Sequence, residues 1–168
     1  MNISKGLLTL GLALALAAPA AAQEEEAVFL PIKRLSMDMA LKLAQAAIAA
    51  CRKEGMNVAV TVVDRGGHPQ VVLRDTLAMD LTLTISRQKA YSAMSFNRPL
   101  SQLQGRFKGA YQVPKIDGIV MSAGGLPINA GGAIVGGVGV SGAPSGEIDE
   151  KCAKAGLDAI QVEMEMAG

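Results

Sequence analysis

Aromatic and histidine residues are scarce in this chain, and their scarcity excludes several functions. The sequence has no tryptophan, two tyrosines and three phenylalanines, so it offers few rings on which nucleobases could stack. Sixteen basic and fifteen acidic side chains nearly balance, which leaves no positive surplus to neutralise phosphates. A nucleic-acid partner is therefore not expected. A single histidine among 168 residues also excludes zinc sites and facial triads that need two or more imidazoles.

The chain also lacks an apolar run long enough for a membrane span at its N-terminus. Residues 1–5 carry one positive charge, residues 6–18 are apolar, and residues 20–22 are small enough for cleavage. This is the pattern of a secretory signal peptide over residues 1–22. We expect cleavage before Gln23, a periplasmic or secreted protein, and no transmembrane segment in the mature chain. An anchoring helix is the weaker alternative, because the apolar run has no polar face.

The part that remains after cleavage has the length of one ordinary domain. Residues 23–34 read as an acidic, loosely ordered leader, and residues 35–168 as a single domain that is large enough for its own core. Loss of Lys5 leaves fifteen basic against fifteen acidic side chains, so the mature net charge is near zero. Low charge together with glycine-rich strands favours a homo-oligomer.

Cysteine is limited to two residues, Cys51 near the end of the first predicted helix and Cys152 near the start of the last. In an oxidising compartment a disulfide is one interpretation, because two antiparallel helices would bring the residues together. Two buried free thiols that act as small apolar side chains are the other interpretation. The residues alone leave both alternatives open.

The hydrophobic pattern predicts an α+β domain with the element order α-ββ-αα-βββ-α. Helical spacing and β-branched runs between glycine-rich turns distinguish the two kinds of element. The predicted helices cover residues 37–54, 80–95, 100–108 and 146–165, and the predicted strands cover residues 57–63, 70–73, 118–122, 126–129 and 133–140. Strands joined by tight glycine turns are antiparallel, so we expect an antiparallel sheet of about five strands flanked by helices.

The stretch Gly137-Val138-Gly139-Val140-Ser141-Gly142 matches the G-x-G-x-x-G pattern of dinucleotide-binding loops. In that class the pattern follows the first strand of a parallel βαβ unit, whereas here it lies on the last predicted strand of an antiparallel sheet. The next helix also begins beyond Pro144, so its N-terminal amides would not face the same anion. We interpret these glycines as positions where a helix or a neighbouring subunit lies directly on the strand.

Three stretches, taken in order, resemble the GlcG/HbpS-like haem-binding family. They are V-V-D-R-G-G-H at 62–68 with Arg74-Asp75 after it, R-Q-K-A-Y-S-A at 87–93 with F-N-R-P at 96–99, and G-G-L-P-I at 124–128 continuing into 136–142 and 147–153. The sequence departs from the family pattern where Asp75 directly follows Arg74 and where Ala143 replaces a glycine. The resemblance implies an α+β domain with an antiparallel sheet, a homo-oligomer and, for exported members, haem binding.

His68 is the candidate axial ligand of haem iron, since imidazole is the commonest protein ligand of that metal. An exposed turn residue is the alternative interpretation of His68. The other candidates lie in or near the predicted helix at 80–95: Tyr91, Met94 and Met79 as alternative axial ligands or pocket walls, and Arg87, Lys89 and Arg98 as partners of haem propionates. The alternatives for these are core packing, a solvated helix face or an oligomer contact.

Three acidic residues are assigned structural roles. Asp64 is expected to cap the hairpin turn through the backbone of the turn itself. Asp149 and Glu150 are expected to favour the start of the last helix electrostatically. No pair of carboxylates is identified as an acid and a base.

The sequence therefore favours an exported, oligomeric haem-binding protein, and a binding protein more than a catalyst. One alternative, suggested by the GlcG side of the resemblance, is an accessory protein or enzyme of a small hydroxyacid or alcohol pathway. Another alternative is an oligomeric sensor or scaffold partner of a second exported protein.

Overall fold

The computed structural model describes residues 28–110 and 112–167. Its helices are α1 (Met37–Lys53), α2 (Leu81–Phe96), α3 (Gly146–Asp158) and α4 (Gln161–Ala167), with short 3₁₀ turns η1 (Leu100–Leu103) and η2 (Val113–Lys115). Its strands are β1 (Ala59–Asp64), β2 (Pro69–Arg74), β3 (Gly125–Ala130) and β4 (Ala133–Ser141). The predicted signal peptide and the first residues of the leader lie outside the described residues. No helix in the described part is both long and apolar enough to cross a membrane.

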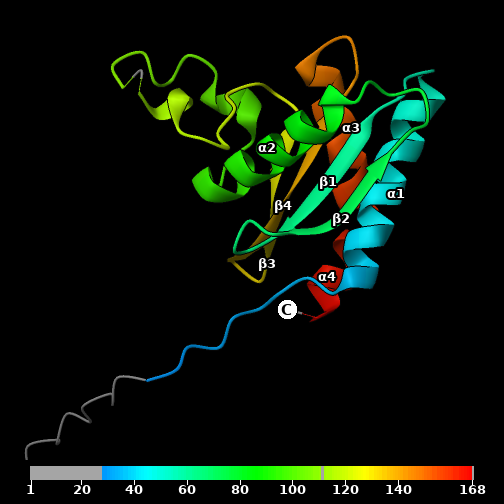
Figure 1. The fold of residues 1–168 in the computed structure, drawn as a ribbon. Helices are drawn as coiled ribbons and strands as arrows, with labels where there is room; N and C mark the ends of the chain where they lie inside the picture. Colours follow the sequence, from blue (N-terminus) through cyan, green and yellow to red (C-terminus); the bar gives the residue numbers. More distant parts are fainter. Residues whose placement is uncertain (1–27, 111, 168) are drawn as a thin grey trace, which may run out of the picture. The chain divides into compact units, whose positions relative to one another are not determined.

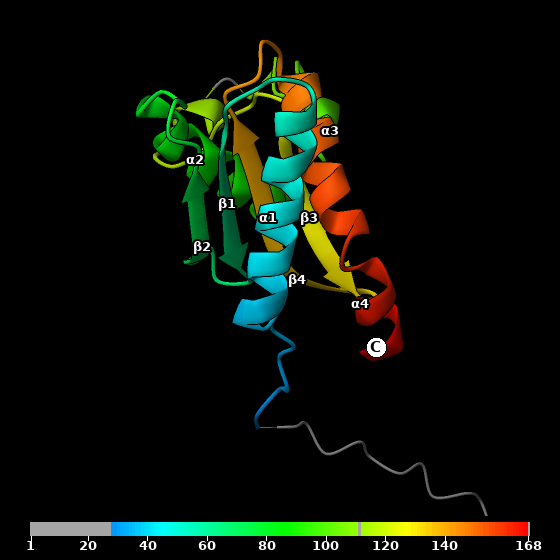
Figure 2. The same ribbon diagram turned by 90° about the vertical axis from the view of Figure 1, so that its right-hand side faces the viewer.

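The four strands form one antiparallel sheet in the order β2-β1-β4-β3. At the centre, Val60 of β1 lies opposite Leu73 of β2 on one side and opposite Val140 of β4 on the other. Every residue of β1 is buried, because helices cover both faces of the sheet. Figure 1 shows α2 over one face, and Figure 2 shows α1 and α3 side by side over the other. The main core lies between the sheet and the two helices α1 and α3.

The α+β class and the antiparallel sheet are confirmed, but the sheet has four strands and the order is α-ββ-α-ββ-αα. The prediction of a strand at residues 118–122 is wrong. The Val120 N–H donates to Ser92 Oγ on α2 at 2.9 Å, and the Ile119 N–H closes a turn on the Ile116 carbonyl at 3.0 Å. Because these two N–H groups are already paired with a side chain and a turn carbonyl, they do not pair with a neighbouring strand.

Two predicted helices also differ from the observed ones. The helix expected at residues 100–108 is only the η1 turn followed by further turns, and Gly105 then adopts φ 72°, which ends any helical path. The single helix expected at residues 146–165 is divided into α3 and α4. Ile160, at the division, is fully buried in the main core, so the chain turns there to bury this side chain.

The glycines of β4 allow α2 to lie directly on the sheet, as the sequence predicts. A Cβ on Gly137 would overlap the Ala90 carbonyl oxygen of α2, and one on Gly139 would overlap the Ser86 carbonyl oxygen. Both clashes are with helix backbone, which no side-chain rotation relieves. The G-x-G-x-x-G stretch is therefore a packing surface for a helix.

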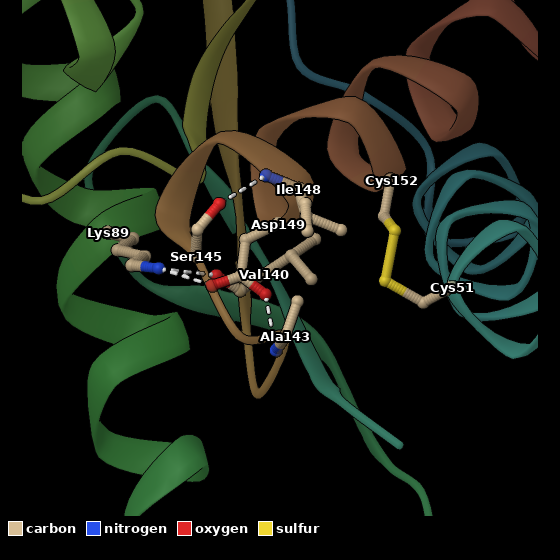
Figure 3. The surroundings of a disulfide bond; sticks show 8 residues. All are labelled: Cys51, Lys89, Val140, Ala143, Ser145, Ile148, Asp149 and Cys152. Atoms are coloured by element: carbon tan, nitrogen blue, oxygen red, sulfur yellow. Dashed lines mark hydrogen bonds and ion pairs between the residues drawn. A yellow bond between two sulfur atoms is a disulfide. The ribbon is translucent and has the colours of Figure 1, made fainter. Parts of the chain in front are cut away.

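A disulfide between Cys51 and Cys152 joins α1 to α3, so the disulfide interpretation is the correct one of the two. The two Cα atoms lie 5.5 Å apart, within the usual range for such a bond. Both cysteines are buried in the main core, and Figure 3 shows the bond bridging the two neighbouring helices. The bond closes a sequence separation of 101 residues, so it links the first helix of the domain to the C-terminal part.

Candidate ligand site

The turn between β1 and β2 is built around the carboxylate of Asp64. Its Oδ1 accepts the backbone N–H of Gly66 at 2.8 Å and that of His68 at 3.0 Å. The backbone of Gly67, at φ 81°, has a conformation that residues with a side chain rarely adopt. The predicted cap is confirmed, and its consequence is that the backbone of His68 is held at a fixed point beyond the turn.

The imidazole of His68 is 82% exposed, and its Nδ1 lies 3.5 Å from Asp64 Oδ1. On the other side of the carboxylate, Arg34 Nη1 lies 3.3 Å from Asp64 Oδ2. Burial alone would raise the pKa of Asp64, but the N–H donors of His68 and Gly66 and the charge of Arg34 outweigh it and lower that pKa. The carboxylate beside His68 is thus held in its anionic form.

A groove of about 740 Å³ lies between this hairpin and α2, and His68 is part of its wall. This volume falls in the range of sites for small molecules and cofactors. The wall combines apolar, amide, hydroxyl and charged side chains with two glycines of the hairpin turn. Its residues are Thr61, Gly66, Gly67, His68, Pro69, Val72, Leu83, Thr84, Arg87, Gln88, Tyr91, Asp117 and Gly118.

The ring of Tyr91 is held between two glycines. A Cβ on Gly67 would lie 2.6 Å from atoms of the Tyr91 ring, and one on Gly118 would lie 3.7 Å from it. The hairpin turn and the loop before β3 therefore both approach the ring closely. This contact joins the turn that carries His68 to the helix that carries Arg87.

Helix α2 contributes one face to the groove. Thr84, Arg87, Gln88 and Tyr91 follow the spacing i, i+3, i+4, i+7, which places them on a single side of the helix. Of these, Arg87 and Tyr91 are predicted site residues, whereas Thr84 and Gln88 were missed. The helical spacing from Tyr91 was the signal that could have identified them.

The other predicted site residues lie elsewhere. Met94 is near the hairpin, 3.2 Å from a Cβ placed on Gly67, but it is not among the groove's wall residues. Met79 is exposed ahead of α2, and Arg98 is exposed just after it. The structure thus brings His68, Arg87 and Tyr91 together and leaves Met79, Met94 and Arg98 outside this groove.

Lys89 is buried on the opposite side of α2 from solvent, in an ion pair with Asp149 of α3. Its Nζ lies 2.8 Å from Asp149 Oδ2 and donates to the Val140 carbonyl at 3.0 Å, as Figure 3 shows. Asp149 Oδ1 also accepts the Ala143 N–H at 3.0 Å. Burial raises the pKa of Asp149, and Lys89 opposes that rise. The ammonium of Lys89 is therefore bound in the interior, and Lys89 is not among the wall residues of the groove.

Within the described residues, no three His, Cys, Asp or Glu side chains gather as a metal site. His68 is the single imidazole of the chain. A transition metal bound at His68 would therefore have to bring further ligands with it, as iron does when a porphyrin already supplies four nitrogens.

The fold and the groove define a class: a single-sheet α+β domain in which a hairpin presents an imidazole beside a hollow of ligand size. Residues 35–158 match the family described as HbpS-like haem-degrading proteins. The chain belongs to this family.

Individual relatives agree with that assignment. The chain is 31% identical over 132 residues to a 15.0 kDa protein of Citrobacter freundii encoded between dhaT and dhaS, covering 76% of this chain and 92% of that protein. A double-mutant form of HbpS from Streptomyces reticuli is 40% identical with a TM-score of 0.77, over 87% of this chain and 99% of that one. The PduOC–haem complex shares the fold, with a TM-score of 0.70 at 24% identity over 76% of this chain and 96% of that one.

Proposed function

We propose that this protein is an exported haem-binding protein in which His68 is the axial ligand and the groove beside it receives the tetrapyrrole. The observation that carries the proposal is the exposed imidazole at the wall of a groove that also holds a cation and an aromatic ring. An imidazole ligates iron, a guanidinium binds carboxylates, and apolar side chains pack on the macrocycle. The side chains of the groove match each chemical part of haem.

Five wall residues have a role in this proposal. His68 ligates the iron through one ring nitrogen, and Arg87 donates to a propionate. Val72, Leu83 and the Tyr91 ring form the apolar contacts, and Val72 is 47% exposed without a ligand. When bound, haem would supply an iron atom that can exchange electrons, and these side chains would hold it in the groove.

The relatives support the proposed ligand class. The family is described as haem-degrading, and PduOC was crystallised with haem. Binding at the groove is the step that precedes either storage or breakdown of the ligand. The persistence of the haem absorbance after binding therefore distinguishes capture from degradation.

Export is supported by two independent features. The N-terminal sequence has the three-part pattern of a signal peptide. The Cys51–Cys152 disulfide is a bond that persists in oxidising compartments and is rare in the cytosol. Both features support a periplasmic or secreted localisation, and cell fractionation with an N-terminal sequence of the mature protein tests it.

A homo-oligomer is part of the proposal as well. Three exposed apolar side chains outside the groove follow one another between the end of β2 and the first residue of α2: Leu77, Met79 and Leu81. Burying such side chains against a second copy removes apolar surface from water. Sedimentation of the mature chain over a range of concentrations tests this, and a monomer at every concentration would contradict it.

A haemin titration followed by absorbance tests the binding proposal. Wild type is expected to bind saturably, and His68→Ala is expected to lose the Soret shift. Arg87→Ala is expected to weaken binding about 10- to 100-fold, the effect of one charge-assisted hydrogen bond, whereas Arg98→Ala, which removes the same group outside the groove, changes little. Weak, unsaturable binding by wild type would overturn the haem proposal. Unchanged binding by His68→Ala would overturn the ligand assignment.

A further inference from the structure

The environment of the His68 imidazole assigns a role to Asp64 beyond the hairpin cap. We propose that Asp64 is a positioning residue, whose carboxylate holds the His68 ring in one tautomer and presents Nε2 to the groove. The claim about the tautomer concerns the protein without any ligand. Its consequence for an axial ligand rests on the proposed haem-binding function.

The carboxylate of Asp64 is itself rigid. Its Oδ1 is held by two backbone N–H groups at 2.8 and 3.0 Å, and the residue is only 6% exposed at the end of a buried strand. The imidazole of His68, by contrast, is 82% exposed. A fixed anion beside an exposed ring favours one orientation of that ring.

The ring nitrogen that faces the anion is Nδ1, at 3.5 Å from Oδ1. An anion at this distance stabilises a proton on Nδ1, and the neutral ring then carries its lone pair on Nε2. In the ring the two nitrogens are on different edges, so Nε2 points away from the carboxylate. Carboxylate partners of this kind orient metal-binding histidines and increase their basicity.

Three other charged side chains lie near the Asp64–His68 pair or in the groove. Arg34 contacts Asp64 Oδ2, the oxygen that does not face the ring. Arg87 and Asp117 also line the groove, from α2 and from the loop before β3. Asp117 provides a matched control, because it places a second carboxylate in the same groove with no ion pair or hydrogen bond to His68 recorded among the described residues.

The test is ¹⁵N NMR of the sole imidazole in the haem-free, untagged mature protein, at a pH where the ring is neutral. Wild type is expected to show the Nδ1–H tautomer. Asp64→Asn keeps an oxygen for the turn N–H groups but removes the charge, so the population is expected to shift toward Nε2–H. Asp117→Asn is expected to leave the tautomer as in wild type.

A second variant approaches the contact from the other side. A Cβ on Gly66 would lie 2.9 Å from His68 Nδ1, so Gly66→Ala displaces the ring while the Asp64 charge remains. It is expected to shift the tautomer in the same direction as Asp64→Asn. A wild-type tautomer in both folded variants overturns the proposal, and so does an equal shift in Asp117→Asn.

The haemin titration separates this proposal from the proposed function. If haem binds through His68, Asp64→Asn should weaken binding about 10- to 100-fold, the usual effect of losing such a partner. If wild type fails to bind haemin while the tautomer still shifts in Asp64→Asn, the haem proposal fails and the positioning role stands. If haem binds through His68 and the tautomer does not respond, the positioning role fails alone.

Discussion

At the scale of single residues, two buried carboxylates have pKa values shifted in opposite directions. Asp64 accepts two backbone N–H groups of the hairpin turn, and its pKa is lowered although burial alone would raise it. Asp149 lies in the interior, where burial raises its pKa and Lys89 provides the compensating charge. The first carboxylate orients a candidate ligand, and the second ties α2 to α3.

Lys89→Met is expected to destabilise the protein by about 3–5 kcal/mol at neutral pH, because it leaves the Asp149 charge buried without a partner. Lys154→Met, which removes an exposed lysine from its pair with Asp158, should cost about 1 kcal/mol or less. Urea unfolding measures both. Equal costs for the two variants would contradict the importance of the buried pair.

The stability lost in Lys89→Met is expected to depend on pH in one direction. An aspartate with a raised folded-state pKa destabilises the fold as pH rises through the interval between its unfolded and folded pKa values. In Lys89→Met the Asp149 carboxylate lacks its counter-charge. Protonation of Asp149 at low pH removes this buried charge and so stabilises the variant. The difference in unfolding free energy between wild type and Lys89→Met is therefore expected to narrow as pH is lowered from neutral toward the usual aspartate range, about 4.

At the scale of elements, the contact between α2 and β4 positions the groove. α2 carries Arg87 and Tyr91, and its backbone rests on Gly137 and Gly139 of β4. The hairpin carries His68 and meets α2 at the Tyr91 ring. A displacement of α2 therefore changes the distance between the candidate ligand and the candidate cation.

Gly139→Ala is expected to push α2 away from the sheet, since the new Cβ would lie 2.5 Å from the Ala90 backbone nitrogen. Overpacking of this kind costs about 1–3 kcal/mol, and haemin binding should weaken with it. Gly109→Ala is the control, because a Cβ there meets nothing within 4 Å. Thermal unfolding and the haemin titration measure the two effects. A Gly139→Ala protein as stable as Gly109→Ala would contradict the close contact.

At the scale of the whole domain, the Cys51–Cys152 bond ties the first helix to the C-terminal part of the chain. α1 and α3 are adjacent in space although they are far apart in sequence, and they cover the same face of the sheet (Figure 2). A cross-link between such distant segments restricts the unfolded chain over most of the domain.

Reduction of this disulfide is expected to lower the unfolding free energy by about 2–5 kcal/mol, the usual loss for a native bond that closes a long loop. The buried site requires partial unfolding before a reductant can act, so reduction should be slow under native conditions. A Cys51→Ser, Cys152→Ser double variant should show the lower stability with and without dithiothreitol. Wild type whose urea midpoint does not change after complete reduction would contradict this prediction.

The sequence by itself determined the features that depend on near neighbours. Helical spacing and turn residues located α1, α2 and the β1–β2 hairpin. Asp64 was assigned to the turn as a residue type that caps its own backbone, and it does accept amides two and four residues away. The motif order also indicated the family to which the chain belongs. Interactions over so few residues leave a direct pattern in the sequence.

Only the tertiary structure decided the features that depend on distant segments. The cysteine pairing, the burial of Lys89 against Asp149 and the loop at residues 118–122 each follow from which elements pack together. The same packing brings His68 of the hairpin beside Arg87 and Tyr91 of α2. A lysine on a helix has the same local sequence signal whether it faces solvent or a buried carboxylate sixty residues away. The role of Lys89 therefore depends on how the fold places α2 and α3, and could not be predicted from its neighbours in the sequence.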